Sequence, residues 1–244
     1  GHGVNSNKNN RQGGPPASAV GQPEKRFVMK KWTRVMYQPN LPLEAGRYVT
    51  ASKEHIALSL EAATEGMVLL KNDNQILPLN GNKKIAFIGK YAKTPRYQGG
   101  GSSHINSWKV ESALEAAKEI PELANVTFAE GYQDEKDEVV EDLQKEAVKA
   151  AAEADVAVLF LGLPDNFESE GYDRKHMNLP NCQNQLVQKV LEVQKHVIVV
   201  LHNGSAVLMP WKDQVEGILE AYLGGEAVGR AVAEVLAGKK NPCG

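Results

Sequence analysis

From about residue 84 to residue 237, short apolar runs alternate with longer stretches whose apolar positions recur at helical spacing. Apolar runs of four to eight residues that end at turn-forming residues predict buried strands, and the longer stretches predict amphipathic helices. Strands separated by helices are joined by right-handed crossovers, which place them in a parallel sheet. The pattern therefore predicts an α/β fold, a three-layer α/β/α sandwich with a mostly parallel, roughly six-stranded sheet.

The individual elements follow from the same pattern. Strands are predicted over residues 67–70, 84–89, 126–129, 156–162, 197–202 and 217–222. Helices are predicted over residues 52–66, 110–119, 138–154, 183–194 and 227–237. Ser52 is a good N-cap for the first helix, and the segment 72–82 contains Asn74, Pro78 and Gly81, which predict turns.

The chain before residue 52 has a different composition. Residues 1–23 are rich in glycine, asparagine, proline and serine and contain almost no large apolar groups, which predicts a disordered tail. Residues 24–51 carry aromatic and aliphatic side chains without a clean period, which predicts an extended arm or linker. We therefore expect the sandwich domain to cover residues 52–244.

Composition narrows the choice of partners and compartment. The chain has 28 Lys and Arg against 30 Asp and Glu, a net charge of −2, which gives no electrostatic reason to expect nucleic acid or an anionic membrane. Its two cysteines, Cys182 and Cys243, are too few for a disulfide framework. No stretch reaches the ~18 apolar residues of a membrane span, and the polar N-terminus lacks the apolar core of a signal peptide. These features predict a soluble, cytoplasmic protein.

The segment 167–174, called the acid loop below, is the most informative part of the sequence. It places Glu168, Glu170, Asp173 and Arg174 around a glycine directly after the predicted strand 156–162. Ligands bind at the carboxyl ends of strands in open α/β sheets, and either glutamate could act as a general acid if a second surface raised its pKa. We expect an Asp173–Arg174 ion pair to organise the loop. The alternative is a solvated charge cluster.

The glycine loop, residues 98–103, supports several interpretations. Its backbone amides could cradle a phosphate, it could be a surface turn, or Ser102 and Ser103 could bind sugar hydroxyls. About nine residues separate Gly89 from Gly99, so the loop does not follow the first strand as a dinucleotide fingerprint does, and there is no Walker lysine. A nucleotide-dependent enzyme therefore has little support.

The segment 202–205 ends another predicted strand with a serine. It lacks the flanking glycines of a nucleophile elbow, so we expect a turn in which Asn203 and Gly204 adopt left-handed backbone angles. The other histidines lack the spacing of a paired metal site, which predicts ordinary surface or helix residues and no metal. Four of these histidines are His55, His104, His176 and His196.

Several ordered motifs carry a family resemblance. They are the segments 63–72 and 77–79, the glycine loop with Tyr97, the stretch from Glu168 to Arg174, residues 203–205 with 210–211, and residues 224–226 leading to 235–239 and 241–242. The chain resembles, over residues 52–244, the α/β sandwich domain of glycoside hydrolase family 3, which contains β-glucosidases and related exo-acting enzymes. Motifs spread in the correct order over a whole domain make this resemblance specific.

The resemblance implies a retaining enzyme in which two carboxyl groups flank the scissile bond. The nucleophilic aspartate belongs to a separate (β/α)8 barrel, in a Ser/Thr-Asp-Trp context that this chain lacks. The sandwich domain supplies the acid/base glutamate, which is best matched by Glu170, with Glu168 as the competing assignment. The implied substrate-binding residues are Ser102, Ser103, Glu168, Tyr172, Asp173 and Arg174, and no cofactor is implied.

The resemblance thus leads us to expect the acid/base-bearing domain of a β-glucosidase-type hydrolase. It would hydrolyse terminal β-D-glucosyl residues of a β-glucoside or oligosaccharide when paired with its barrel, and would be inactive alone. The alternative is a non-catalytic carbohydrate-binding or assembly domain of the same fold. The order of the two domains in the parent chain stays open, although the predicted tail favours the family branch in which the sandwich domain precedes the barrel. The sequence is also compatible with a homo-oligomer.

Overall fold

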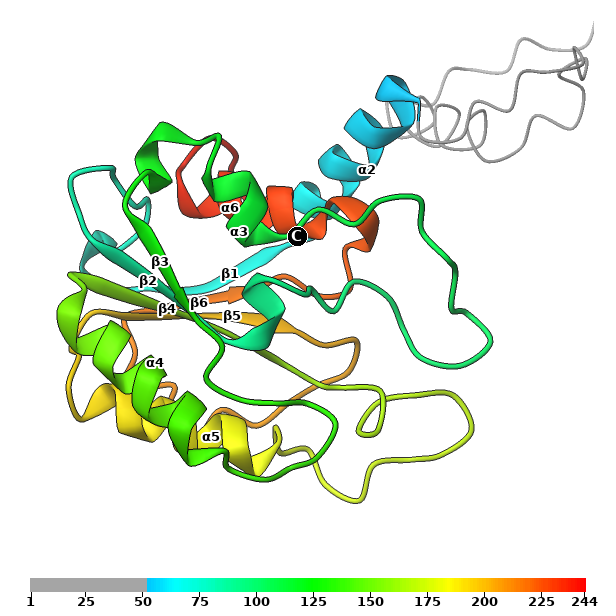
Figure 1. Cartoon of the computed structure of the whole chain (residues 1–244). Coiled ribbons are helices and arrows are strands. Elements are labelled where there is room, and N and C mark those ends of the chain that lie inside the picture. The colour runs from blue at the N-terminus through cyan, green and yellow to red at the C-terminus, as the bar shows by residue number, and fades with distance from the viewer. Residues whose placement is uncertain (1–51) are drawn as a thin grey trace, which may run out of the picture. The chain divides into compact units, whose positions relative to one another are not determined.

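The computed structural model describes residues 52–244, so the predicted tail (1–23) and arm (24–51) lie outside the described residues. Figure 1 shows a sheet between two layers of helices, with α2, α3 and α6 over one face and α4 and α5 over the other. This arrangement confirms the predicted α/β/α sandwich. None of the helices in this part of the chain is long and apolar enough to cross a membrane.

The sheet has six strands in the order β1-β6-β5-β4-β2-β3. They are β1 (Val68–Asn72), β2 (Ile85–Ile88), β3 (Val126–Ala129), β4 (Val156–Gly162), β5 (Val197–His202) and β6 (Gly217–Glu220). Only the β1–β6 pair is antiparallel, and its register shifts between Leu69 and Lys71. The prediction of a mostly parallel sheet of about six strands is therefore confirmed.

The helices of the described chain are α2 (Lys53–Glu65), α3 (Ala113–Ala117), α4 (Glu141–Glu153), α5 (Asn181–Leu191) and α6 (Val228–Leu236). Short 3-10 segments cover Asp73–Gln75, Lys90–Ala92, Pro121–Leu123 and Gly225–Ala227. The Ser52 hydroxyl accepts the His55 N–H at 3.1 Å, which confirms the predicted N-cap. The helix predicted from residue 110 begins later because Ser112 and Glu115 form a capping box.

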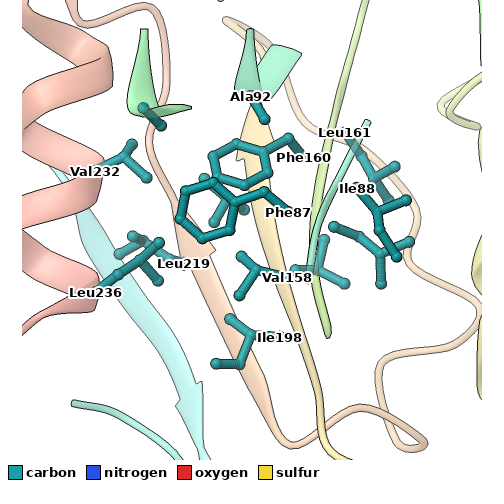
Figure 2. Close-up of a cluster of buried hydrophobic side chains, with 14 of the residues drawn as sticks. Phe87, Ile88, Ala92, Val158, Phe160, Leu161, Ile198, Leu219, Val232 and Leu236 are labelled. Atoms are coloured by element: carbon teal, nitrogen blue, oxygen red, sulfur yellow. The ribbon is translucent and has the colours of Figure 1, made fainter. Parts of the chain in front are cut away.

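The central strands form the core because helices cover both of their faces. Every residue of β4 and β5 is buried. Figure 2 shows Phe87 and Phe160 on one side of the sheet and Ile88 and Leu161 on the other, as expected for alternating side chains. The rings of Phe87 and Phe160 pack with their centroids 4.9 Å apart. This packing gives the loops at the strand ends a rigid base.

The parallel strands all end at one edge of the sheet, at the right in Figure 1. β2 and β4 are neighbours and pair from Ile85 and Val156 to Ile88 and Leu159. The long connections that follow these two strands contain the glycine loop and the acid loop. Strand order therefore brings together two segments that lie about 70 residues apart in the chain.

Candidate active site at the carboxyl edge of the sheet

The glycine loop and the acid loop contact each other directly. Gly100 and Ser169 form a parallel bridge, and the Ser102 N–H donates to Glu170 Oε2 at 2.7 Å. Gly101 has a φ of +91°, and a Cβ at this position would lie 2.5 Å from the Glu170 Cβ. Only glycine combines this backbone angle with this close approach. The glycine loop is therefore the partner of Glu170, a role that none of the three sequence interpretations included.

Glu170 is exposed and is held by the glycine loop alone among the described contacts of its carboxylate. Hydrogen bonding by Ser102, first from its side chain and then from its backbone, lowers the pKa of Glu170. A carboxylate that accepts hydrogen bonds is stabilised in its charged form. In this domain Glu170 is consequently ionised at neutral pH.

Glu168 has very different surroundings two residues earlier. Its side chain is 17% exposed, and its Oε2 accepts the Gly204 N–H at 2.9 Å while its Oε1 accepts the Ser205 hydroxyl. Arg96 donates from Nη2 to the Glu168 carbonyl at 3.0 Å, and the same nitrogen lies 3.8 Å from Glu168 Oε2. Glu168 therefore lies in a network that joins the segments after β2, β4 and β5.

Arg96 and Asp165 are site residues that sequence reasoning missed. The Arg96 side chain is 6% exposed and forms an ion pair with Asp165, whose carbonyl accepts the Tyr172 hydroxyl. The sequence gives one weak signal, because Arg96 directly precedes Tyr97 and the glycine loop. An arginine in a connecting segment is normally exposed, and only the folded loops show that this one is enclosed.

A cleft of about 540 Å³ gathers most of the predicted substrate-binding residues. Its lining includes Glu168, Tyr172, Asp173 and Arg174. The cleft also includes Ser205, which sequence reasoning assigned to a simple turn. Ser102 and Ser103 do not line it; they are exposed in the glycine loop beside Glu170. The predicted residues therefore separate into a Glu168 side with a cleft and a Glu170 side on the surface.

Two local predictions are wrong. No ion pair joins Asp173 and Arg174, because Arg174 Nη2 donates instead to the Ala206 carbonyl at 2.7 Å. Asn203 and Gly204 are not among the residues with positive φ. The turn is made instead by the Asn203 side chain, whose amide donates to the Ser205 carbonyl at 3.1 Å. In both cases a side chain, that of Arg174 or Asn203, donates a hydrogen bond to a backbone carbonyl in the segment after β5.

Two buried titratable residues lie beneath the loops. Glu220, the last residue of β6, is 7% exposed, and burial raises its pKa to about 7. His202, the last residue of β5, is 1% exposed, and burial lowers its pKa to about 4. Their only sequence signal is that a polar residue ends each apolar strand. Both are candidates for tuning the site.

The histidines singled out in the sequence do not gather at one place. His196 contacts Glu216 at 2.8 Å, and Nδ1 of His104 contacts the Gln98 side-chain amide at 3.2 Å. The His176 ring lies 6.3 Å from the ring of Phe167. Over residues 52–244, no three or more His, Cys, Asp or Glu side chains are grouped so that they could hold a metal ion.

Comparison with known proteins decides the family. Residues 67–244 match the family model described as the glycosyl hydrolase family 3 C-terminal domain. The chain belongs to this family. The resemblance based on its motifs is thereby confirmed, together with the α/β fold described above.

Individual relatives cover the same part of this family-3 chain. It is similar to the thermostable beta-glucosidase B of Acetivibrio thermocellus, with 51% identity over 78% of this chain and 25% of that protein. An exo-alpha-(1->6)-L-arabinopyranosidase of Bifidobacterium longum is 42% identical over 78% of this chain and 26% of that protein. The crystal structure of a Bifidobacterium adolescentis GH3 beta-glucosidase superposes with a TM-score of 0.75 and 40% identity, over 89% of this chain and 31% of that one. The chain thus spans about a quarter to a third of the length of these relatives.

Proposed function

We propose that this chain is the acid/base-bearing domain of a retaining β-glucosidase-type hydrolase, with Glu170 as the acid/base residue. It acts when paired with a (β/α)8 barrel domain that carries the nucleophile. The observation that supports this most is the joining of Glu170 to the glycine loop at the carboxyl edge of the sheet. That edge is where α/β sheets bind ligands, and the relatives include β-glucosidases.

In this mechanism Glu170 works twice. It first protonates the glycosidic oxygen while the nucleophile of the barrel attacks the anomeric carbon, so the glycosidic bond breaks and a covalent glycosyl intermediate forms. It then takes a proton from the water that resolves this intermediate. Glu168, Tyr172, Asp173 and Arg174 bind the sugar or its aglycone from the cleft beside the acid loop.

The first step needs a protonated Glu170, and this sets a requirement on the partner. In the domain alone Ser102 lowers the pKa of Glu170, and the side chain is exposed. A barrel that covers the acid loop removes water, and its nucleophilic carboxylate adds a like charge about 5–5.5 Å away. Both effects raise the pKa of a carboxyl group. Pairing of the domains therefore supplies the protonation state that the isolated domain lacks.

A second candidate is a non-catalytic carbohydrate-binding domain. The ionised state of Glu170 and the cleft of about 540 Å³ favour it for the isolated chain. The two candidates differ in a simple way. A binding domain retains its affinity for glucosides when Glu170 is replaced, whereas an acid/base domain shows its main loss in turnover.

The test is hydrolysis of an aryl β-glucoside by this chain alone and after mixing with a separately produced family-3 barrel. We expect activity only in the mixture. Glu170→Ala should lower its turnover, because no base then activates the water that resolves the glycosyl intermediate, and azide should restore part of it by attacking that intermediate without general-base help. Activity of the chain alone would contradict the proposal. A mixture that forms a stable complex but hydrolyses no glucoside would favour the non-catalytic carbohydrate-binding domain.

A matched control is available on the same fold. Glu153→Ala removes an exposed glutamate at the end of α4 that, within residues 52–244, pairs only with Lys149, at 3.9 Å. This variant should leave the activity of the mixture unchanged. Glu168→Gln distinguishes the competing assignment, because azide should not rescue a residue that only binds the sugar.

A further inference from the structure

Glu220 is a buried carboxyl that the proposed mechanism does not use. It ends β6 and pairs in register with Leu201 of β5 and Val68 of β1, so apolar strands flank it on both sides. Its Oε1 accepts the Tyr222 N–H at 3.2 Å, and its Oε2 accepts the Asn203 Nδ2–H at 3.3 Å. Burying a carboxyl without an ion-pair partner is costly, so its retention requires a reason.

Asn203 connects this carboxyl to the site. Its side-chain amide is 2% exposed and donates to both the Glu220 carboxylate and the Ser205 carbonyl, at 3.3 and 3.1 Å. The next two residues, Gly204 and Ser205, bind the two oxygens of Glu168. A continuous chain of hydrogen bonds therefore runs from β6 through the turn after β5 to the acid loop.

The geometry around Glu220 depends on a carboxylate. A carboxylate oxygen can accept from each of the two donors, Tyr222 N–H and Asn203 Nδ2–H. An amide or a protonated carboxyl carries a hydrogen on one side, and the Asn203 amide relieves this by turning its unpartnered Oδ1 towards Glu220, which breaks its bond to the Ser205 carbonyl. Tyr222 also has a φ of +53°, a left-handed angle that a non-glycine residue holds only when its surroundings fix it.

We propose that Glu220 is a positioning residue, which through Asn203 holds the turn 203–205 where that turn binds the Glu168 carboxylate. Glu220 does not touch the substrate cleft. Its relevance to catalysis rests on the proposed hydrolase function. The positioning itself is a property of the isolated domain and can be tested there, so its failure is separate from failure of the proposed function.

Protonation of Glu220 should weaken this positioning. Burial is the main cause that raises the pKa of Glu220 to about 7, and the negative charge of Glu168 raises it further. The other charged groups nearby are Arg96, which faces Glu168, and His202 in β5, which burial keeps neutral near pH 7. His176 lines the same cleft as Glu168 and Ser205, so a pH step in the turn is assigned to Glu220 by its loss in the Glu220→Gln chain.

The experiment follows exchange of the Gly204 amide proton with water by NMR, in the 244-residue chain, at about pH 6 and about pH 8, on either side of the Glu220 pKa. After correction for intrinsic exchange, we expect several-fold higher protection at the higher pH. Glu220→Gln should lower protection about tenfold at the higher pH and remove the pH step, because the amide satisfies only one donor. Asn203→Ala should also remove the step.

A control and a decisive outcome complete the test. Glu216→Gln changes a carboxylate just before β6, at the opposite end of the strand, where it binds Asn74 and His196. It should retain the wild-type pH step. Gly204 protection at about pH 8 that is unchanged in a folded Glu220→Gln chain would overturn the proposal, because the turn would then not depend on the Glu220 carboxylate.

Discussion

Two carboxylates in the acid loop, two residues apart, have opposite surroundings. Glu168 is mostly enclosed and receives hydrogen bonds from Gly204 and Ser205, whereas Glu170 is exposed and is hydrogen-bonded by Ser102 of the glycine loop. The enclosed group is the better organised in this domain. A covering domain would change the pKa of the exposed Glu170 most, because this carboxylate still has water to lose. A loop can therefore hold one carboxylate ready and leave the other to be completed by a partner.

The largest expected effect tests this comparison directly in the paired enzyme. Glu170→Gln should lower kcat/KM by about 10²- to 10⁴-fold for glycosides with poor leaving groups and far less for activated aryl glycosides, because only the former need a general acid in the bond-breaking step. Glu168→Gln should lower kcat/KM for both substrate types by a similar and smaller factor. Steady-state kinetics on the two substrate types check this. Equal losses on both for Glu170→Gln would reverse the assignment of the two residues.

A second prediction concerns the pH dependence of stability beneath the Glu168 side. Because the pKa of Glu220 is raised to about 7, this residue adds to the free energy of unfolding below about pH 4.5. The contribution is lost as the pH rises through 7. The lowered pKa of His202, about 4, stabilises the fold above about pH 6.5, and this is lost as pH falls through 4. The two slopes oppose each other between these limits.

Replacing Glu220 separates these slopes. The stability of Glu220→Gln minus that of the wild type should rise by about 3 kcal/mol from pH 4.5 to pH 7.5, measured by urea unfolding at several pH values. Glu216→Gln is the control of opposite sign, because hydrogen bonds from His196 and Asn74 outweigh burial and lower the pKa of Glu216. A difference that does not vary with pH would show that Glu220 titrates normally.

A third prediction uses two glycines that share a backbone angle. Gly101 and Gly171 have φ values of +91° and +95°, but a Cβ would meet Glu170 at the first position and nothing within 4 Å at the second. Gly171→Ala should cost about 1 kcal/mol through backbone strain alone. Gly101→Ala should cost about 1 kcal/mol more and release Glu170 from Ser102. Urea unfolding measures both, and equal costs would mean that the two loops do not pack as described.

The smallest expected effect concerns Ser205. Ser205→Ala removes one of the two donors to Glu168 and should cost about 1 kcal/mol of stability, since the Gly204 N–H still satisfies the other oxygen. Thermal unfolding compares this variant with Ser103→Ala, which changes an exposed serine that makes no hydrogen bond with residues 52–244. If the two variants lose the same stability, the Ser205 hydroxyl does not hold Glu168.

Sequence reasoning predicted the layers and the strands well because apolar runs such as 156–162 and 197–202 have few alternatives to burial in a sheet. Element ends were less accurate. The last strand was expected to reach Tyr222, but β6 ends at Glu220. The left-handed angle of Tyr222 ends the extended strand there, and composition gives no sign of it.

The arrangement of the candidate site was predicted in part. The acid loop and its cleft residues were found because charges cluster around Gly171 after an apolar strand. Arg96, Asp165 and Glu220 were missed because their role depends on which strand ends are neighbours, and a single sequence does not give strand order. The Asp173–Arg174 ion pair was expected from adjacency alone, whereas Arg174 reaches the Ala206 carbonyl across the edge.

The bridge between Gly100 and Ser169 bears on how family-3 C-terminal domains can be engineered. A library that diversifies residues 99–103 while the acid loop is kept would mostly produce mismatched pairs, since any side chain at position 101 collides with Glu170. Screens of such a library would record lost activity and misread it as lost sugar recognition. The practical unit of exchange between relatives is both segments together, taken from one parent.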